Sequence, residues 1–419
     1  MRIIADLHIH SRYSRATSPD MNLGTIAMWA RLKGIDIVGT GDFTHPRHFA
    51  SIEECLKEAE HGLYALKDSK EKNPARFMLS AEVSNIYKQD GKTRKIHCLI
   101  FAPSIKAAKK INSVLSRLGN VSSDGRPIFG FSAKDLLKIT LDASEDAMLV
   151  PAHAWTPWFS IFGSKSGFDS IEECFGELSP HIRAIETGLS SNQRMNRRLS
   201  SLDKITLISN SDAHSPQKLG REANVFDSGM DYREVIDILR KKDKKRFLFT
   251  IEFFPEEGKY HYDGHRECGV CMSPEETKKA HGICPVCNKG LTVGVLNRVA
   301  GLADRPEDFS NPDDIPQKEL VPLQEILSES LSCGVASAKI QKEYRRLTSI
   351  AGSEFRLLLD MPEAELRAIA GDKTAEAVIK VRNGDIKILP GYDGEYGKVR
   401  IFNGVEMPVP KTAAQRSLF

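Results

Sequence analysis

Short apolar runs alternate with amphipathic stretches along the first 250 residues of the chain. The apolar runs have the length of buried strands and occur at 3–9, 35–39, 77–79, 97–102, 147–152, 182–185 and 205–208. The stretches between them space their apolar residues at helical intervals, at 22–32, 51–66, 105–118, 133–144, 192–201 and 232–242. Repeated strand–helix units of this kind predict an α/β fold with a parallel sheet, either a barrel or a doubly wound sheet.

Histidines and carboxylates recur near the ends of the predicted strands. His8 and His10 stand at i and i+2 of the first strand, so both imidazoles leave the same face. Comparable positions behind or within later runs hold Asp42, Glu82, His97, His153, Asp212 and His214. Any one of them could be a core residue or a helix cap. Their recurrence at the edge where parallel α/β enzymes build active sites favours a shared metal site, with His45 and Glu186 as supporting residues.

These residue types suit particular ions and a particular reaction. Imidazole and carboxylate ligands favour Zn²⁺ or Mn²⁺, with Mg²⁺ as an alternative. Two such ions about 3.5–4 Å apart activate a water molecule and stabilise the leaving oxygen in phosphoester hydrolysis. The sequence carries no signature of a cysteine or serine nucleophile and no Walker A motif, so a covalent intermediate and nucleotide-driven chemistry are not expected.

The order of these motifs resembles that of the PHP (polymerase and histidinol phosphatase) family over about residues 1–250. The resemblance implies a (β/α)7 barrel that hydrolyses phosphoester bonds. It implies one ion held by His8, His10, Glu82 and Asp212, a second held by Glu82, His97 and His153, and a third held by Asp42 and His214. Asp42 stands where the family commonly has a histidine, and near Arg15 the family often supplies a further ligand. Arg15 is therefore expected to meet a phosphate instead.

An apolar loop follows His153 directly. It carries Trp155, Trp158 and Phe159, and a loop this apolar is expected to pack on something. One interpretation is a lid that folds back onto the barrel. The other is that some of these rings stack on an unstacked nucleic-acid base beside the metal ions.

A small module at 251–295 contains two Cys-x-x-Cys pairs. Cys268 and Cys271 are separated by twelve residues from Cys284 and Cys287, a spacing typical of a tetrahedral zinc site with four thiolate ligands. A closed thiolate site is structural, and so small a domain depends on its metal for folding. His261, His265 and His281 lie nearby as competing ligands.

The remainder is predicted to form a mostly helical C-terminal domain at 296–410 and a tail at 411–419. Lys339, Lys342 and Arg346 share one face of a helix that begins near residue 337, which makes them candidate DNA contacts. Two short helices meeting at Gly371 resemble a helix–hairpin–helix, which can hold a backbone phosphate. The tail carries part of a sliding-clamp-binding motif: Gln415, Leu418 and Phe419.

Composition narrows the setting further. The chain has 419 residues, which predicts two or three domains, and a net charge of +3, which alone decides nothing about nucleic acid. Four scattered cysteines and two paired motifs suit metal binding in a reducing compartment. The sequence shows neither a signal peptide nor an apolar run long enough for a membrane helix, so the cytoplasm is the expected location.

The succession of a PHP-like barrel, a four-cysteine module and a basic helical region resembles the endonuclease Q family. The resemblance implies hydrolytic cleavage of DNA on the 5′ side of deaminated bases (hypoxanthine, uracil, xanthine) or abasic sites, with the damaged nucleotide flipped out of the duplex. It also implies damaged DNA as the partner. The partial motif in the tail, and not this resemblance, predicts the sliding clamp as a second partner. Two alternatives stay open: a small-molecule phosphatase of the histidinol-phosphate type, and a non-catalytic metal-binding module of a replication or repair complex.

Overall fold

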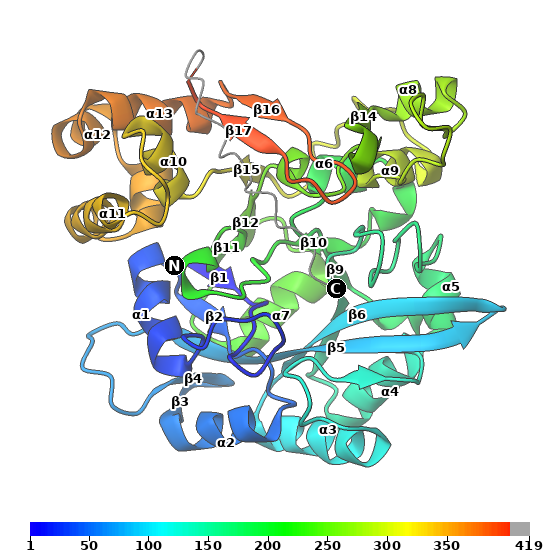
Figure 1. The fold of residues 1–419 in the computed structure, drawn as a ribbon. Coiled ribbons are helices and arrows are strands. Elements are labelled where there is room, and N and C mark those ends of the chain that lie inside the picture. Colours follow the sequence, from blue (N-terminus) through cyan, green and yellow to red (C-terminus); the bar gives the residue numbers. More distant parts are fainter. Residues whose placement is uncertain (403–419) are drawn as a thin grey trace, which may run out of the picture.

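A mixed β-sheet forms the centre of the computed structural model, which describes residues 1–402 (Figure 1). All of the predicted apolar runs contribute strands: β1 (Arg2–Asp6), β2 (Ile37–Gly39), β5 (Arg76–Gln89), β6 (Lys92–Ala102), β8 (Met148–Pro151), β9 (Ala184–Glu186) and β10 (Thr206–Ile208). Strands β1, β2 and β5 are parallel neighbours, and β9 and β10 form a separate parallel pair. The predicted α/β class is confirmed.

The sheet is less regular than a uniformly parallel barrel. Strand β6 runs antiparallel to β5, because a two-residue turn at Asp90 and Gly91 joins the two strands directly. It also runs antiparallel to β8. Both turn residues have positive φ, at 52° and 73°, as in the tight hairpin turns that favour Asp-Gly. Within residues 1–402 no ladder joins β8 to β9, and one bridge, Ile9 to Ala213, links the end of β1 to the segment after β10. A closed barrel therefore stays a prediction.

One predicted helix is wrong in its second half. The stretch 51–66 was expected to be a single helix, but α2 (Pro46–Cys55) ends at Cys55 and the chain continues as a hairpin of β3 (Leu56–Glu60) and β4 (Leu63–Leu66). The hairpin reverses at Gly62, which has a φ of +69°. A Cβ atom there would lie 2.6 Å from the Cβ of Tyr232. Close packing against a distant helix, together with the positive φ, overrides the local helical pattern.

Four of the other predicted helices form with capped ends, namely α1 (Leu23–Lys33), α3 (Ile105–Leu118), α4 (Ala133–Ala143) and α7 (Tyr232–Lys241). The predicted helix at 192–201 is wrong beyond its first turn, because α6 (Gln193–Asn196) ends at Asn196. Side chains of Asn22, Ser104 and Asp231 accept hydrogen bonds from backbone N–H groups of the first turns of α1, α3 and α7. These helices bury apolar faces against the sheet and so hold the strand ends in place.

Strands that precede and follow the cysteine-rich module extend the central sheet beyond β1. Strand β11 (Ala223–Asp227) pairs with β1, β12 (Phe247–Glu252) pairs with β11, and β15 (Gln317–Glu319) pairs with β12. The C-terminal helices then follow, as α10 (Leu323–Ser330), α11 (Ala338–Ala351), α12 (Glu363–Ala370) and α13 (Asp372–Asn383). They dock on α1, where the rings of Trp29 and Tyr344 stack at 5.8 Å and Lys33 pairs with Glu354 at 2.7 Å.

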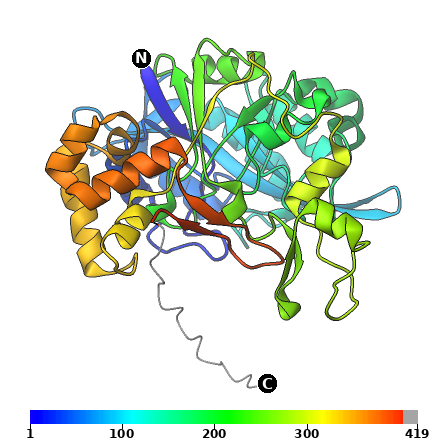
Figure 2. The same cartoon turned by 90° about the horizontal axis from the view of Figure 1, so that it is seen from above.

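The cysteine-rich module lies on the opposite flank from these helices (Figures 1 and 2). It contains β13 (Asp263–His265), β14 (Val270–Met272), α8 (Pro274–Lys279) and α9 (Val295–Leu302). A hairpin of β16 (Lys387–Leu389) and β17 (Lys398–Arg400) reaches across to it, and Asp393 accepts a hydrogen bond from the backbone N–H of Arg266 at 2.7 Å. The boundaries 1–250, 251–295 and 296–410 stay predictions.

Two further sequence-based expectations concern a membrane-spanning helix and the C-terminal tail. No helix within residues 1–402 is long and apolar enough to cross a membrane. The predicted clamp-binding residues Gln415, Leu418 and Phe419 lie outside the described residues.

Candidate metal centre

Two groups of potential metal ligands share one carboxylate. The first comprises His8, His10, Glu82 and Asp212, and the second comprises Glu82, His97 and His153; within each group the ligand atoms lie within 4.8 Å of one another. The Nε2 atom of His10 lies 3.2 Å from Glu82 Oε2 and 3.1 Å from Asp212 Oδ1. On the other side, Glu82 Oε1 lies 2.8 Å from His97 Nδ1 and 3.1 Å from His153 Nε2. Six of the predicted ligands therefore meet, with Glu82 placed to bridge two ions.

The first group has the properties of a cation site. His8 Nε2, His10 Nε2 and Asp212 Oδ1 are buried atoms without a hydrogen-bond partner, and all three belong to this group. Buried polar atoms of this kind normally have a partner, which a metal ion would supply. The donor set of imidazoles and carboxylates suits Zn²⁺ or Mn²⁺.

The pKa values of Glu82 and His97, in the second group, are shifted by burial and by neighbouring charges. Burial alone would raise the pKa of Glu82, but His97 and Arg126 beside it hold that pKa well below its usual range. Burial lowers the pKa of His97 to about 4, against the attraction of Glu82. At neutral pH His97 is neutral, and the guanidinium of Arg126 is then the charge that keeps the carboxylate of Glu82 ionised, as metal ligation requires.

A buried carboxylate orients His8. Both oxygens of Glu186 lie within 3.1 Å of His8 Nδ1, and they also accept hydrogen bonds from Asn210 Nδ2 and the backbone N–H of His153, each at 2.9 Å. An Nδ1–H bond to Glu186 leaves His8 Nε2 free to face the other ligands. The predicted supporting role of Glu186 thus has a geometric basis.

Asp42 has a different place from the one expected. Its Oδ1 lies 3.0 Å from His10 Nδ1, while Oδ2 accepts hydrogen bonds from the backbone N–H and hydroxyl of Ser11 and from the hydroxyl of Ser14. These bonds occupy a fully buried carboxylate. In this arrangement Asp42 orients His10. The predicted third ion, held by Asp42 and His214, stays a prediction. His214 lies at the partly exposed rim, with its ring 4.5 Å from that of His10.

Three of these residues adopt backbone conformations that are rare outside glycine. The φ angles of Asp42, His153 and Asp212 are +43°, +29° and +46°. Each costs about 1–3 kcal/mol and persists where surrounding contacts enforce it. Asp6 helps to enforce the turn at Asp212, because its buried carboxylate accepts the backbone N–H groups of Ser211 and Gly220. Sequence reasoning gave Asp6 no role.

Arg126 is a further residue of the centre that sequence reasoning missed. Its Nη1 lies 2.9 Å from Glu82 Oε2. It belongs to a polar turn between α3 and β7 (Ile128–Phe129), which carries no periodic pattern. The one local signal is Gly125, where a Cβ atom would lie 2.3 Å from Asp42 Oδ2. His45 braces the same turn through Nε2 and the carbonyl of Ser122, at 3.2 Å.

The aromatic loop divides into a buried and an accessible part. Trp155 is only 1% exposed and donates its indole N–H to Asn196 at 2.7 Å, so its ring offers no face to a base. The predicted DNA contact through Trp155 therefore does not fit the structure. The ring of Phe159 packs 4.7 Å from His97, at the edge of the metal centre. Trp158 is 38% exposed and meets Tyr260 edge to face at 5.7 Å.

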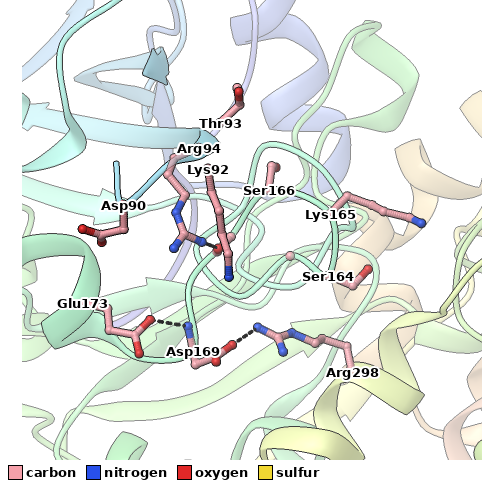
Figure 3. Close-up of a pocket in the computed structure, with 12 residues that line it drawn as sticks. Asp90, Lys92, Thr93, Arg94, Ser164, Lys165, Ser166, Asp169, Glu173 and Arg298 are labelled. Atoms are coloured by element: carbon pink, nitrogen blue, oxygen red, sulfur yellow. Dashed lines mark hydrogen bonds and ion pairs between the residues drawn. The ribbon is translucent and has the colours of Figure 1, made fainter. Parts of the chain in front are cut away.

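A hollow of about 930 Å³ lies behind this loop (Figure 3). Its arginines are engaged in holding the loop. Arg94 donates to the carbonyl of Gly167 and lies over the ring of Phe168 at 4.0 Å, and Arg298 pairs with Asp169 at 2.5 Å. Lys165 points away from these contacts. These contacts of Arg94 and Arg298 hold the end of the loop that carries Phe159.

The cysteine-rich module contains a ligand group that differs from the expected one. Cys268, Cys284 and Cys287 come together, but His265 completes the group, with its Nδ1 3.4 Å from Cys287 Sγ. Cys271, the fourth predicted ligand, is exposed on β14 and lies outside the group. Three thiolates and one imidazole are an ordinary structural zinc set.

The predicted basic contacts lie apart from the metal centre. Lys339, Lys342 and Arg346 lie on α11, on the flank opposite the zinc module, and Arg346 is engaged with Glu343 at 2.6 Å. Arg15 is exposed beside the turn of Arg126, with its backbone N–H 3.3 Å from Asp124.

Sequence comparisons identify two relatives and one family. Residues 322–385, from just before α10 to just past the end of α13, match the family model described as the MJ0043 C-terminal domain. The uncharacterized protein YqxK of Bacillus subtilis is 28% identical over 411 residues, 95% of this chain and 99% of that relative. The uncharacterized protein MJ0043 of Methanocaldococcus jannaschii is 32% identical over 254 residues, 59% of this chain and 31% of that relative.

Solved structures are more informative about the fold. The crystal structure of the lesion-specific endonuclease PfuEndoQ from Pyrococcus furiosus matches with a TM-score of 0.84 and 29% identity, covering 96% of this chain and 95% of the other. The resemblance to endonuclease Q is confirmed. A structure of endonuclease Q with a 27-mer duplex substrate, which has an abasic lesion at the active site, matches with a TM-score of 0.83, 29% identity and coverage of 96% and 97%. The likeness to endonuclease Q therefore extends over nearly the whole chain.

Proposed function

We propose that this protein is a metal-dependent DNA repair endonuclease that hydrolyses the phosphodiester on the 5′ side of a deaminated base or an abasic site. The observation that carries the proposal is the pair of ligand groups joined by Glu82, set in a chain that matches endonuclease Q over 96% of its length. One of those structures holds duplex DNA with an abasic lesion at its active site. A small-molecule phosphatase would need neither the zinc module nor the C-terminal helices.

The proposed chemistry assigns a role to each part of the centre. Ions held by the two groups would supply Lewis acidity and lower the pKa of bound water. One ion would be held by His8, His10, Glu82 and Asp212. The other would be held by Glu82, His97 and His153. Glu186 and Asp42 keep the imidazoles of His8 and His10 in the required orientation. Phe159 shields one side of His97 from water.

The mouth of the centre also suits an unstacked nucleotide. Trp158, in the loop that follows His153, presents exposed ring surface, and the half-buried Tyr260 packs against it edge to face. The hydroxyl of Thr156 lies within reach of both His153 Nδ1 and the Trp158 carbonyl. Base–aromatic stacking contributes about 1–3 kcal/mol per base. That gain would offset the few kcal/mol that it costs to flip a base out of the duplex. The cost is smallest for a mispaired or missing base. Arg15, Lys339 and Lys342 stay proposed backbone contacts.

A panel of labelled duplexes tests the proposal. Duplexes that carry uracil, hypoxanthine, an abasic site or no lesion are incubated with the protein and Mn²⁺ or Zn²⁺, with and without chelator, and the cut is mapped. The expected result is a metal-dependent nick 5′ of the lesion with a 3′-hydroxyl end. His8→Ala and Asp212→Ala should abolish nicking while duplex binding persists, and the exposed His61→Ala should nick like wild type. Turnover of a free phosphomonoester without nicking would instead support a small-molecule phosphatase.

A further inference from the structure

The turn that carries Arg126 is fastened to the metal centre from several sides. Gly125 donates its N–H to the Tyr13 carbonyl at 2.9 Å, and its carbonyl accepts the hydroxyl of Thr44 at 3.2 Å. The backbone N–H of Arg126 donates to Asp124 at 3.1 Å. On the other side, β7 pairs with β5, the strand that bears Glu82. The backbone of Arg126 is thus held at a defined distance from the bridging carboxylate.

The side chain of Arg126 occupies a position between the ligands and solvent. Its side chain is 26% exposed, whereas that of Glu82 is fully buried. Glu82 Oε1 faces His97 and His153, and Oε2 faces Arg126 at 2.9 Å. Among the ion pairs of residues 1–402, this one alone joins a lysine or arginine to a predicted metal ligand.

Metal ions change what this guanidinium has to neutralise. Ions held by Glu82 and its neighbours would take over the charge that Arg126 balances. The guanidinium then remains at the rim, fastened through its backbone and partly open to solvent. Arginine binds phosphate through two parallel hydrogen bonds, so a phosphodiester that approaches the ions meets a matching donor pair.

We propose that Arg126 binds the non-bridging oxygens of the scissile phosphate once the ions are in place. The inference rests on the proposed nuclease function and names a substrate contact within it. Arg126 would then act on the reacting group itself, whereas a merely structural Arg126 would act only on Glu82.

A substrate-side substitution separates these two roles. Wild type and Arg126→Gln are compared in single-turnover nicking of lesion duplexes that carry either a normal phosphate or a methylphosphonate of each stereochemistry at the scissile position. Arg126→Gln should lower the rate on normal phosphate at least about 100-fold, as loss of a preorganised donor typically does. The methylphosphonate penalty should be at least about 10-fold smaller in the variant than in wild type, for one stereoisomer. Arg126→Lys should fall between the two proteins because it keeps the charge but loses the paired donors.

Metal content and a surface variant serve as controls. Arg126→Gln should bind at least as much metal as wild type, because it removes a competitor for Glu82. Arg117→Gln, on the exposed side of α3, should behave as wild type. Penalties that multiply independently for both stereoisomers, or loss of metal in Arg126→Gln, would overturn the inference. Failure of wild type to nick any lesion duplex would instead refute the proposed function.

Discussion

Replacing Glu186 by glutamine should weaken metal binding by the His8 group about 10- to 100-fold. Both carboxylate oxygens act as acceptors, from His8 Nδ1, Asn210 Nδ2 and the His153 backbone N–H. An amide nitrogen in place of either oxygen would point N–H at N–H and leave one buried donor unpaired. That costs about 1–3 kcal/mol, and the loss of orientation of a ligating histidine typically costs 10–100-fold in metal affinity or activity.

Metal titration of chelator-treated protein, followed by calorimetry or by competition with a chelating dye, measures this effect. Glu222→Gln is the matched control. Glu222 is also fully buried, but its Oε2 has no hydrogen-bond partner, so an amide meets no opposing donor there. The control should retain wild-type affinity. Equal affinities of wild type and Glu186→Gln would show that Glu186 does not orient His8.

Three other substitutions test other parts of the structure. His265→Ala should weaken zinc binding by the module at least about 100-fold, because one of four ligands is lost, while Cys271→Ser should not; zinc content after chelator treatment decides, and the reverse result would restore the four-cysteine site. Lys33→Met should cost about 3–5 kcal/mol in urea unfolding, since the buried Glu354 would lose its counter-charge and keep only hydrogen bonds from Tyr344 and the backbone of Leu323; a loss below about 1 kcal/mol would contradict this. Burial raises the pKa of Glu257 from 4.5 to about 8. The stability that its proton provides is full below pH 4.5 and is lost as pH rises through 8, so Glu257→Gln should show a smaller fall in melting temperature between pH 5 and 8, and an equal fall would refute this.

Much of the metal centre could be predicted because its ligands lie in, or shortly after, strands that the apolar runs mark. The i, i+2 spacing of His8 and His10 brings both rings to one ligand group, although β1 ends at Asp6 and both residues follow it. Glu82 lies in β5 and His97 in β6, whereas His153 follows the end of β8. Strand β5 is flanked by β2 and β6, so its carboxylate meets ligands from both sides.

The parts that sequence could not supply depend on contacts between distant segments. Arg126 sits in a turn without periodicity, and only its ion pair with Glu82 reveals its place. The Cys-x-x-Cys spacing made Cys271 an obvious ligand, yet pairing of β13 with β14 brings His265 to the cluster and leaves Cys271 outside the group. The helical pattern of 51–66 likewise yielded to Gly62 and its packing against α7.

In the proposed reaction, a pair of ions held on either side of Glu82 performs the cleavage. The most direct measurement titrates Mn²⁺ or Zn²⁺ into chelator-treated protein and records bound metal and nicking of a uracil or abasic duplex on the same samples. We predict that nicking rises with occupancy of the two groups, that Glu82→Gln abolishes both, and that the zinc of the cysteine-rich module alone supports neither. Full nicking by protein without metal in these groups would contradict the account.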